Sequence, residues 1–289
     1  MTIPVFPWAA RRMGSLGAAC LMASLALGQV PQSDTPTETA DPPVLDDFTT
    51  RQVVAERPVL PYQPVREADI LFEKRIWRVI DVREKMNLPF IYPEAPLFTV
   101  LAEAALSGQL QAYTDDRFND PMTLAALQDQ LVDRDTVMVF NLDTQMDEAK
   151  LVTNEIDPTA IRRFRVKEAW FFDTNTGQLR VRILGIAPMM DVVDQNGDFK
   201  YERPLFWIHY PTARPFLARQ KVYAPGGNLS ATMTWEDIFE MRHFASMVYK
   251  ESNPYDRRIQ DYLQGEDIVY ESAKINDELF NREHDLWSW

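Results

Sequence analysis

Two stretches with strand composition flank a short turn in the middle of the chain, and they constrain the fold more than any other feature. Residues 162–173 and 178–186 are rich in Val, Ile, Phe and Trp, and Thr-Asn-Thr-Gly lies between them at 174–177. Asn and Gly accept the positive φ angles that tight hairpin turns require. Val181 and Ile183 alternate with arginines, which is typical of a strand with one buried face. The chain therefore contains an antiparallel hairpin.

Further strands are predicted on both sides of this hairpin. Apolar and β-branched composition indicates strands at 109–113, 137–140, 205–210 and 215–223. Asn196-Gly197 marks another turn.

A helix is predicted over residues 66–86, because apolar side chains recur there every three or four positions. They are Ala68, Leu71, Phe72, Ile76, Val79 and Met86. Ile70 and Trp77 would then lie one heptad apart on the opposite face of the helix. Either they are buried between two layers of one domain, or they contact another chain, since Trp is enriched at interfaces.

Four other segments carry helix signals. Residues 97–107 are followed by Gly108, and Asp120-Pro121 is a typical helix start for a segment that ends at Val132. The capping-box pattern at 234–237 begins a helix that we expect to continue to Val248. A last helix is expected over 266–283. The fold class is thus α+β: an antiparallel sheet flanked by N-terminal and C-terminal helices.

The N-terminus has the pattern of a secretory signal peptide. Residues 1–28 contain no acid, Arg11 and Arg12 precede an apolar run, and small residues surround the expected cleavage site before Gln29. The alternative is a lipoprotein signal that leaves a lipid on Cys20, although Gly17 stands where such signals prefer a larger apolar residue. Removing 1–28 would also remove Cys20, the only cysteine, which suits an oxidising compartment.

Residues 29–65 form a proline-rich acidic linker that precedes a folded part at 66–289. Proline fixes φ and lacks a backbone donor, so this stretch cannot form a long regular element. It is either a solvated spacer or an extended arm that lies on a neighbouring subunit.

Charge and composition exclude several classes of function. The chain carries 43 acidic and 30 basic residues, a formal net charge of -13, which argues against nucleic acid as a partner. A single cysteine excludes a disulfide framework and multi-cysteine metal sites. The acidity would suit docking to basic surfaces of protein partners.

No motif predicts catalysis, a cofactor or a metal. His209, His243 and His284 lack metal-ligand spacing. Residues 191–198 resemble a calcium loop, but Arg203 stands where an EF-hand needs its Glu, so a polar hairpin turn is the better interpretation. The sequence therefore predicts a protein that is not an enzyme. The alternative is a periplasmic enzyme or ligand-binding protein that uses an acidic pocket.

Several strings, in the same order, resemble the gliding-motility family GldN, also called PorN. They lie at 66–69, 77–87, 170–173, 182–188, 210–215, 250–259 and 283–287. Two of them read Trp-Arg-Val-Ile-Asp-Val-Arg-Glu-Lys-Met-Asn and Lys-Glu-Ser-Asn-Pro-Tyr-Asp-Arg-Arg-Ile. The resemblance runs from about residue 66 to the end.

The resemblance implies a component of the type IX secretion system of the Bacteroidetes, which serves protein secretion and gliding. Family members are periplasmic and form a ring with an outer-membrane lipoprotein, GldK or PorK, beneath the outer membrane. They also contact the shaft protein GldM or PorM. The resemblance implies no catalytic residues in this chain.

A subunit of a closed ring needs two different surfaces that bind head to tail. From the residues alone, the candidate interaction surfaces are the Ile70 and Trp77 face, the proline-rich arm, and Trp287 and Trp289 in the aromatic C-terminus.

Overall fold

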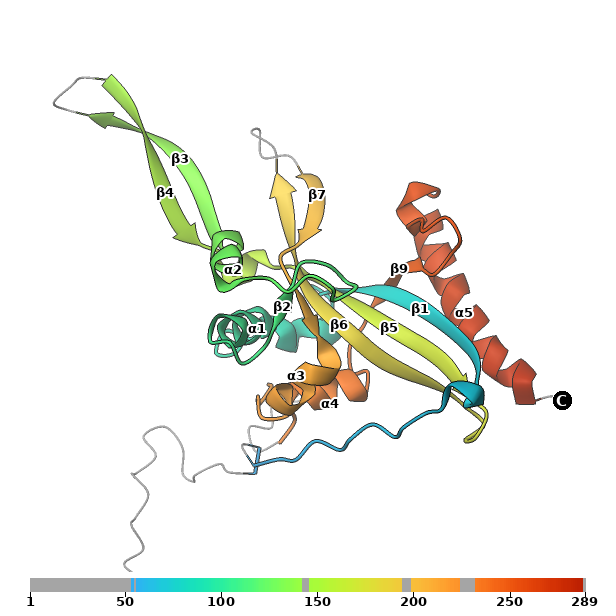
Figure 1. The fold of residues 1–289 in the computed structure, drawn as a ribbon. Coiled ribbons are helices and arrows are strands. Elements are labelled where there is room, and N and C mark those ends of the chain that lie inside the picture. The colour runs from blue at the N-terminus through green and yellow to red at the C-terminus, as the bar shows by residue number, and fades with distance from the viewer. Residues whose placement is uncertain (1–52, 55, 142–145, 194–198, 224–231, 288–289) are drawn as a thin grey trace, which may run out of the picture. The chain divides into compact units, whose positions relative to one another are not determined.

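The computed structural model of the chain describes residues 53–54, 56–141, 146–193, 199–223 and 232–287 (Figure 1). The sequence-predicted signal peptide, most of the linker, the Asn196-Gly197 turn and Trp289 lie outside these residues. The strands are β1 (Ile70–Asp81), β2 (Ala112–Tyr113), β3 (Val132–Asn141), β4 (Met146–Glu155), β5 (Arg163–Asp173), β6 (Gln178–Val193), β7 (Phe199–Pro204), β8 (Trp207–His209) and β9 (Met247–Glu251). The helices are α1 (Leu97–Leu106), α2 (Leu124–Gln130), α3 (Tyr210–Leu217), α4 (Trp235–Glu240) and α5 (Asp267–Trp287).

Seven strands form one antiparallel sheet, which confirms the α+β class. Its order is β2-β8-β6-β5-β1-β9, and β7 pairs with the far end of β6. The β5–β6 hairpin is the predicted one: Asp173 pairs with Gln178 across the turn, and Gly177 has a φ of 65°. β3 and β4 pair only with each other. The sequence predicts part of β3 but not β4.

The prediction of a helix over 66–86 is wrong. This segment consists of a short 3-10 turn η1 (Glu67–Asp69), the strand β1, and a second 3-10 segment η2 (Lys85–Ile91). In β1 the buried residues are Ile76, Arg78 and Ile80, with a period of two. Arg78 lies between the two isoleucines and interrupts the alternation of apolar and polar residues that marks a strand. The apolar residues that remain are spaced as in a helix, so the sequence pattern favours a helix.

Three other element predictions need correction. Residues 215–223 are not a strand, because α3 occupies Tyr210–Leu217 and has Pro211 in its first turn, where a missing N–H costs little. α2 begins after Thr123, whose side chain accepts a hydrogen bond from the Ala126 N–H, and not at Asp120-Pro121. The predicted capping box at Thr234 is present, but α4 ends at Glu240 and the chain then forms β9. The last helix and the helix ended by Gly108 are confirmed.

Two apolar cores cover one face of the sheet. The larger core packs α1, α3 and α4 against Ile80, Phe164 and Ile186 of the strands. The smaller core packs α5, through Ile275 and Leu279, against Ile76 of β1. Between the cores lies Glu168, fully buried, which pairs with Arg78 and Arg242. Because side chains alternate along a strand, the residues between the buried ones, such as Trp77, face the other side of the sheet.

None of the helices in the described ranges is long and apolar enough to cross a membrane.

Candidate interaction surfaces

The four sequence-predicted interaction residues do not come together. Ile70 and Trp77 lie seven positions apart in β1 rather than on one helix face, which places them roughly 23 Å apart along the strand. Trp287 is the last residue of α5, and Trp289 lies outside the described residues. Of these residues, Trp77 has the best-defined surroundings.

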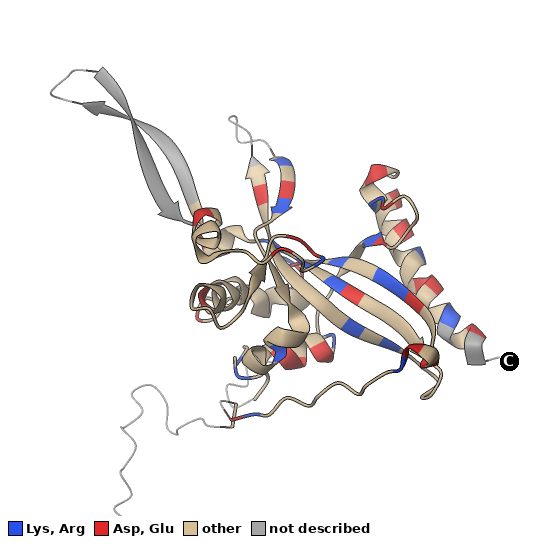
Figure 2. Cartoon of the chain, viewed as in Figure 1, with Lys and Arg blue, Asp and Glu red and all other residues tan. Residues whose placement is uncertain are grey.

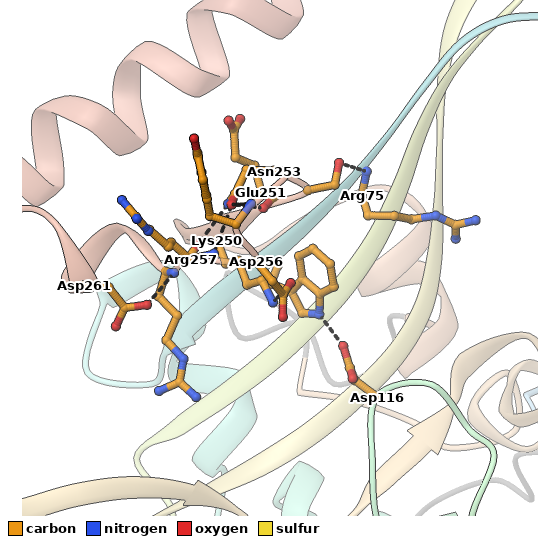
Figure 3. A network of polar contacts seen from close by, with 12 residues as sticks. Arg75, Asp116, Lys250, Glu251, Asn253, Asp256, Arg257 and Asp261 are labelled. Carbon is orange, nitrogen blue, oxygen red and sulfur yellow. Dashed lines mark hydrogen bonds and ion pairs between the residues drawn. The ribbon is translucent and has the colours of Figure 1, made fainter.

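Trp77 lies between two lysines on neighbouring strands. Lys167 of β5 and Lys250 of β9 stand directly opposite Trp77 in the sheet register. Their Nζ atoms lie 5.4 Å and 4.6 Å from the indole centroid, which is cation–π distance. The indole Nε1 donates a hydrogen bond to Asp116 Oδ2 at 2.7 Å (Figure 3). Three strands and one loop therefore fix the orientation of this side chain.

A cleft of about 440 Å³ opens over Trp77, and we refer to it as the Trp77 cleft. Four of its lining residues are cations and two are carboxylates, whereas the whole chain has a net charge of -13. Figure 2 shows Lys and Arg positions on the neighbouring strands β1 and β5 of the sheet. The lining residues are Arg75, Trp77, Asp116, Arg117, Phe118, Lys167, Leu184, His209, Lys250 and Asp256.

The floor of the Trp77 cleft holds its cations in partly desolvated positions. The side chains of Lys167 and Lys250 are 13% and 15% exposed. Burial lowers the pKa of Lys167, although Asp116, 3.4 Å from its Nζ, acts in the opposite direction. The hydrogen bond from Lys250 lowers the pKa of Asp256. Each lysine is therefore paired with a carboxylate of the cleft in a position that is partly shielded from water.

One wall of the Trp77 cleft is a loop organised by Asn253 (Figure 3). The Asn253 amide donates to the carbonyls of Glu251 and Arg257, at 3.0 and 2.8 Å, and its Oδ1 accepts from the Tyr255 and Arg257 N–H groups. These bonds hold Asp256 at a φ of 53°, with its carboxylate 2.5 Å from Lys250 Nζ. The residues of the string at 250–259 therefore form this wall.

The opposite wall is the loop between β2 and α2. Phe118 has a φ of 60°, and its ring contacts Tyr113 and His209 edge-on. Gly185 of β6 lies beneath the ring: a Cβ at this position would come within 2.4 Å of Phe118 Cζ. His209 is half-buried beside this ring, with its Nδ1 3.3 Å from Thr212 Oγ1, and burial lowers its pKa.

A second surface is made by residues 57–63, which we call the arm, within the predicted linker (Figure 1). Arg57 donates two hydrogen bonds to Asp237 of α4, at 2.6 and 2.7 Å. Tyr62 donates to Glu240 at 2.6 Å, and the Arg214 guanidinium stacks 4.0 Å from the Tyr62 ring. The arm therefore lies on α3 and α4 of its own chain.

A third surface is the outer flank of α5. Tyr270 and Phe280 are 69% and 74% exposed, while the buried side of the helix carries Ile275 and Leu279. These two side chains leave apolar surface on the outer flank of the helix.

The side chains of the Trp77 cleft are suited to binding. Lysine and arginine side chains beside an indole bind carboxylates and flat groups. Within the described ranges no group of three His, Cys, Asp or Glu side chains could hold a metal ion.

Sequence reasoning singled out Trp77 but missed Lys167, Lys250 and Asp116. These residues lie far from Trp77 in the chain, and only the strand register brings them together. The available signal was that Trp77 and Lys250 both fall within strings of the family resemblance.

Comparison with known proteins agrees with the resemblance in the sequence. No curated protein matches the chain. The family model described as gliding motility associated protein GldN matches residues 65–288, which is well over half of the chain. The match includes the whole seven-stranded sheet, the Trp77 cleft and the α5 flank, but not the arm. The chain therefore belongs to the GldN family of gliding motility associated proteins.

Proposed function

We propose that this protein is a non-enzymatic structural subunit of the type IX secretion and gliding machinery. It is exported to the periplasm by the signal at 1–28 and joins a ring with a GldK/PorK-like lipoprotein beneath the outer membrane. It also contacts a GldM/PorM-like shaft protein. The observation that carries the proposal is the match to the GldN family over residues 65–288.

The surfaces support a role in assembly. A ring subunit needs two non-identical contact surfaces, one for each neighbour, besides those for other partners. The Trp77 cleft, the arm and the α5 flank are chemically different: basic, mixed-charge and aromatic. We assign interface roles to Trp77 within the cleft and to Trp287 at the end of α5, with Ile70 and Trp289 as further candidates.

Co-expression with the lipoprotein partner tests the proposal. We expect the exported full-length chain to co-purify with the lipoprotein as a large assembly, and a deletion strain to lose secretion of cargo proteins. A chain that stays monomeric beside the lipoprotein, or a deletion strain that secretes normally, contradicts the proposal.

Localisation is tested separately. The chain should be recovered in the periplasmic fraction, and membrane association should require the lipoprotein. If Cys20→Ser abolishes membrane association while the lipoprotein is present, the chain carries its own lipid and the assignment of cleavage before Gln29 is wrong.

A further inference from the structure

Arg165 of β5 is a buried cation without a carboxylate partner in its own chain. It is 9% exposed and lies two positions before Lys167, on the face of the sheet that carries Trp77. Its Nε is buried without a hydrogen bond, and its guanidinium forms no ion pair within the described ranges. Lys167 and Lys250 differ from it, because each already pairs with a carboxylate. A buried charge is costly unless a counter-charge pairs with it, so Arg165 has the properties of an anion-binding residue.

A second unpaired donor belongs to the side chain that contacts Arg165. The Arg165 Cζ lies 4.3 Å from the ring centroid of Tyr249 in β9. Tyr249 is 8% exposed, and its hydroxyl is buried without a hydrogen-bond partner among the residues that the structure describes. One guanidinium N–H and one phenol O–H match in number the two acceptor oxygens of a carboxylate.

Arg258 adds a second guanidinium to this group. Its Cζ lies 5.6 Å from the centroid of the same Tyr249 ring, and the residue is exposed. In the described part of the chain Arg258 forms no ion pair either. Burial lowers the pKa of Arg165, and the charge of Arg258 acts in the same direction. An anion beside the ring would relieve the repulsion between the two arginines.

Two carboxylates act on the pKa of Tyr249, and both already have other partners. Asp116 Oδ2 accepts the hydrogen bond of the Trp77 indole and pairs with a lysine of the Trp77 cleft. Asp261 Oδ2 accepts from the backbone N–H of Arg258 at 2.8 Å. The counter-charge of the two arginines is therefore best supplied by another molecule.

Tyr249 lines a cleft of about 280 Å³, so its ring can be reached from solvent. Three carboxylates also line this cleft, but those of Asp81 and Glu202 both pair with Arg163. The third belongs to Glu84, which is exposed, so its charge is screened by water and salt. The lining therefore does not keep an anion from the ring.

We propose that Arg165, Arg258 and the Tyr249 hydroxyl form a binding site for a carboxylate that reaches them from outside the chain. The planar guanidinium groups favour a flat anion with two oxygens. Two sources offer this chemistry: a free small carboxylate, and an acidic side chain of another subunit. The second source rests on the proposed function, whereas the site itself does not.

The melting temperatures of two variants in chloride buffer test whether Arg165 is unpaired. Arg165→Met removes a buried charge that has no partner, so it should leave the Tm unchanged or raise it. Arg78→Met is the matched control: it breaks a buried pair with Glu168 and should lower the Tm by several degrees. An equal fall for both variants overturns the proposal, because Arg165 then has a partner in its own chain. Asp115, whose Oδ1 is also buried without a hydrogen bond, is the candidate for such a partner.

Acetate is the probe for direct binding to the full chain. Chloride is replaced by acetate at constant ionic strength, and the arginine Nε–H signals are followed by NMR. We expect a saturable shift of the signal that is lost in Arg165→Met. Tyr249→Phe removes one donor to a charged acceptor and should weaken the binding at least about tenfold. Tyr255→Phe, at an exposed tyrosine of the neighbouring loop, is the matched control and should leave the affinity unchanged.

Assembly with the lipoprotein distinguishes the two sources. If another subunit supplies the carboxylate, Arg165→Met with Arg258→Gln should weaken co-purification at least about tenfold. Arg257→Gln, at a neighbouring arginine that lies over the Tyr255 ring, should not weaken it. Acetate binding with unchanged assembly assigns the site to a free carboxylate.

The failure of this inference is distinguishable from the failure of the proposed function. If acetate does not bind and the double variant assembles normally, the carboxylate site is wrong and the proposed function stands. An unaltered chain that never assembles with the lipoprotein overturns the proposed function, and the acetate measurement then decides the site by itself.

Discussion

Glu168 Oε2 accepts a hydrogen bond from Arg78 Nε at 2.9 Å, and the Glu168 carboxylate is completely buried. The same carboxylate accepts from the Trp170 indole and, through its other oxygen, from Arg242. Arg78 in turn donates to Asn276 of α5 at 2.6 Å. This network links β1, β5, the segment after α4 and α5 between the two apolar cores. It fixes α5 and holds β1 in the register that places Trp77 between its lysines.

Replacing Glu168 with alanine should strongly destabilise the fold. The substitution leaves Arg78 buried without a counter-charge, which typically costs about 3–5 kcal/mol. Denaturant unfolding followed by circular dichroism measures the loss. Glu73→Ala, which removes the carboxylate of a half-exposed pair with Arg75, should cost less than about 1 kcal/mol. Equal losses for the two variants would show that the buried network does not stabilise the fold.

The buried Arg78–Glu168 pair explains why the sequence wrongly predicts a helix over residues 66–86. Ile76 and Ile80 alternate with a polar residue, and the strand would be evident if position 78 were apolar. Arg78 is buried because it pairs with Glu168, 90 residues further along the chain. A pattern that counts only apolar residues cannot anticipate such a pair, so it favoured the helical spacing that Leu71, Phe72 and Val79 also satisfy.

The sequence correctly predicts those structural features that depend on residues close together in the chain. The β5–β6 hairpin, the capping box at Thr234 and the glycine end of α1 each depend on residues within a few positions. The Trp77 cleft depends on register between strands that lie 90 and 173 residues apart in the sequence, as Trp77 with Lys167 and with Lys250 shows. The overall composition gives no sign of the Trp77 cleft either, because the chain is acidic as a whole while four cations line the cleft.

Gly185→Ala should disturb the Trp77 cleft without touching its charged residues. The new Cβ would lie 2.4 Å from Phe118 Cζ, so the ring must shift, and we expect the loop that carries it to shift as well. Overpacking of this kind costs about 1–3 kcal/mol. Because Asp116 lies two positions before Phe118, its hydrogen bond to Trp77 should weaken. Faster solvent exchange of the Trp77 indole N–H, measured by NMR, would report this change.

The double variant Gly185→Ala with Phe118→Leu is the control for that mechanism. The smaller side chain makes room for the methyl group, so stability should recover in part and the indole exchange should slow. If the double variant is no more stable than Gly185→Ala alone, the clash with Phe118 is not the cause.

Asp81 should make the free energy of unfolding depend on pH, and the direction of this dependence follows from its pKa. Hydrogen bonds from Arg83, with Nε 2.9 Å from Oδ1, lower the pKa of Asp81 from 3.8 to about 2 against the effect of burial. A carboxyl whose pKa is lower in the folded state stabilises the fold fully above its unfolded pKa, here about 4. This contribution disappears as the pH falls through about 2.

The measurement is the difference in unfolding free energy between the unaltered chain and Asp81→Asn. We expect a difference that is constant above pH of about 4 and shrinks towards zero near pH 2. Because the Arg83 side chain is 60% exposed, solvent screening should keep the plateau below about 1 kcal/mol. A difference that grows on acidification would contradict the assigned direction.

The arm should detach more often when its tyrosine is removed. Tyr62→Ala deletes the 2.6 Å hydrogen bond to Glu240 and the stacking of Arg214 on the ring. A bond to a charged acceptor contributes about 1.5 kcal/mol or more, which corresponds to about a tenfold rise in the detached population. Under conditions where cleavage tracks the open population, trypsin should cut the adjoining chain after Arg66 about ten times faster. Tyr255→Ala removes a tyrosine that is 74% exposed on the wall of the Trp77 cleft, away from the arm, and should leave this rate unchanged. Equal rates in both variants would mean that Tyr62 does not hold the arm on α3 and α4.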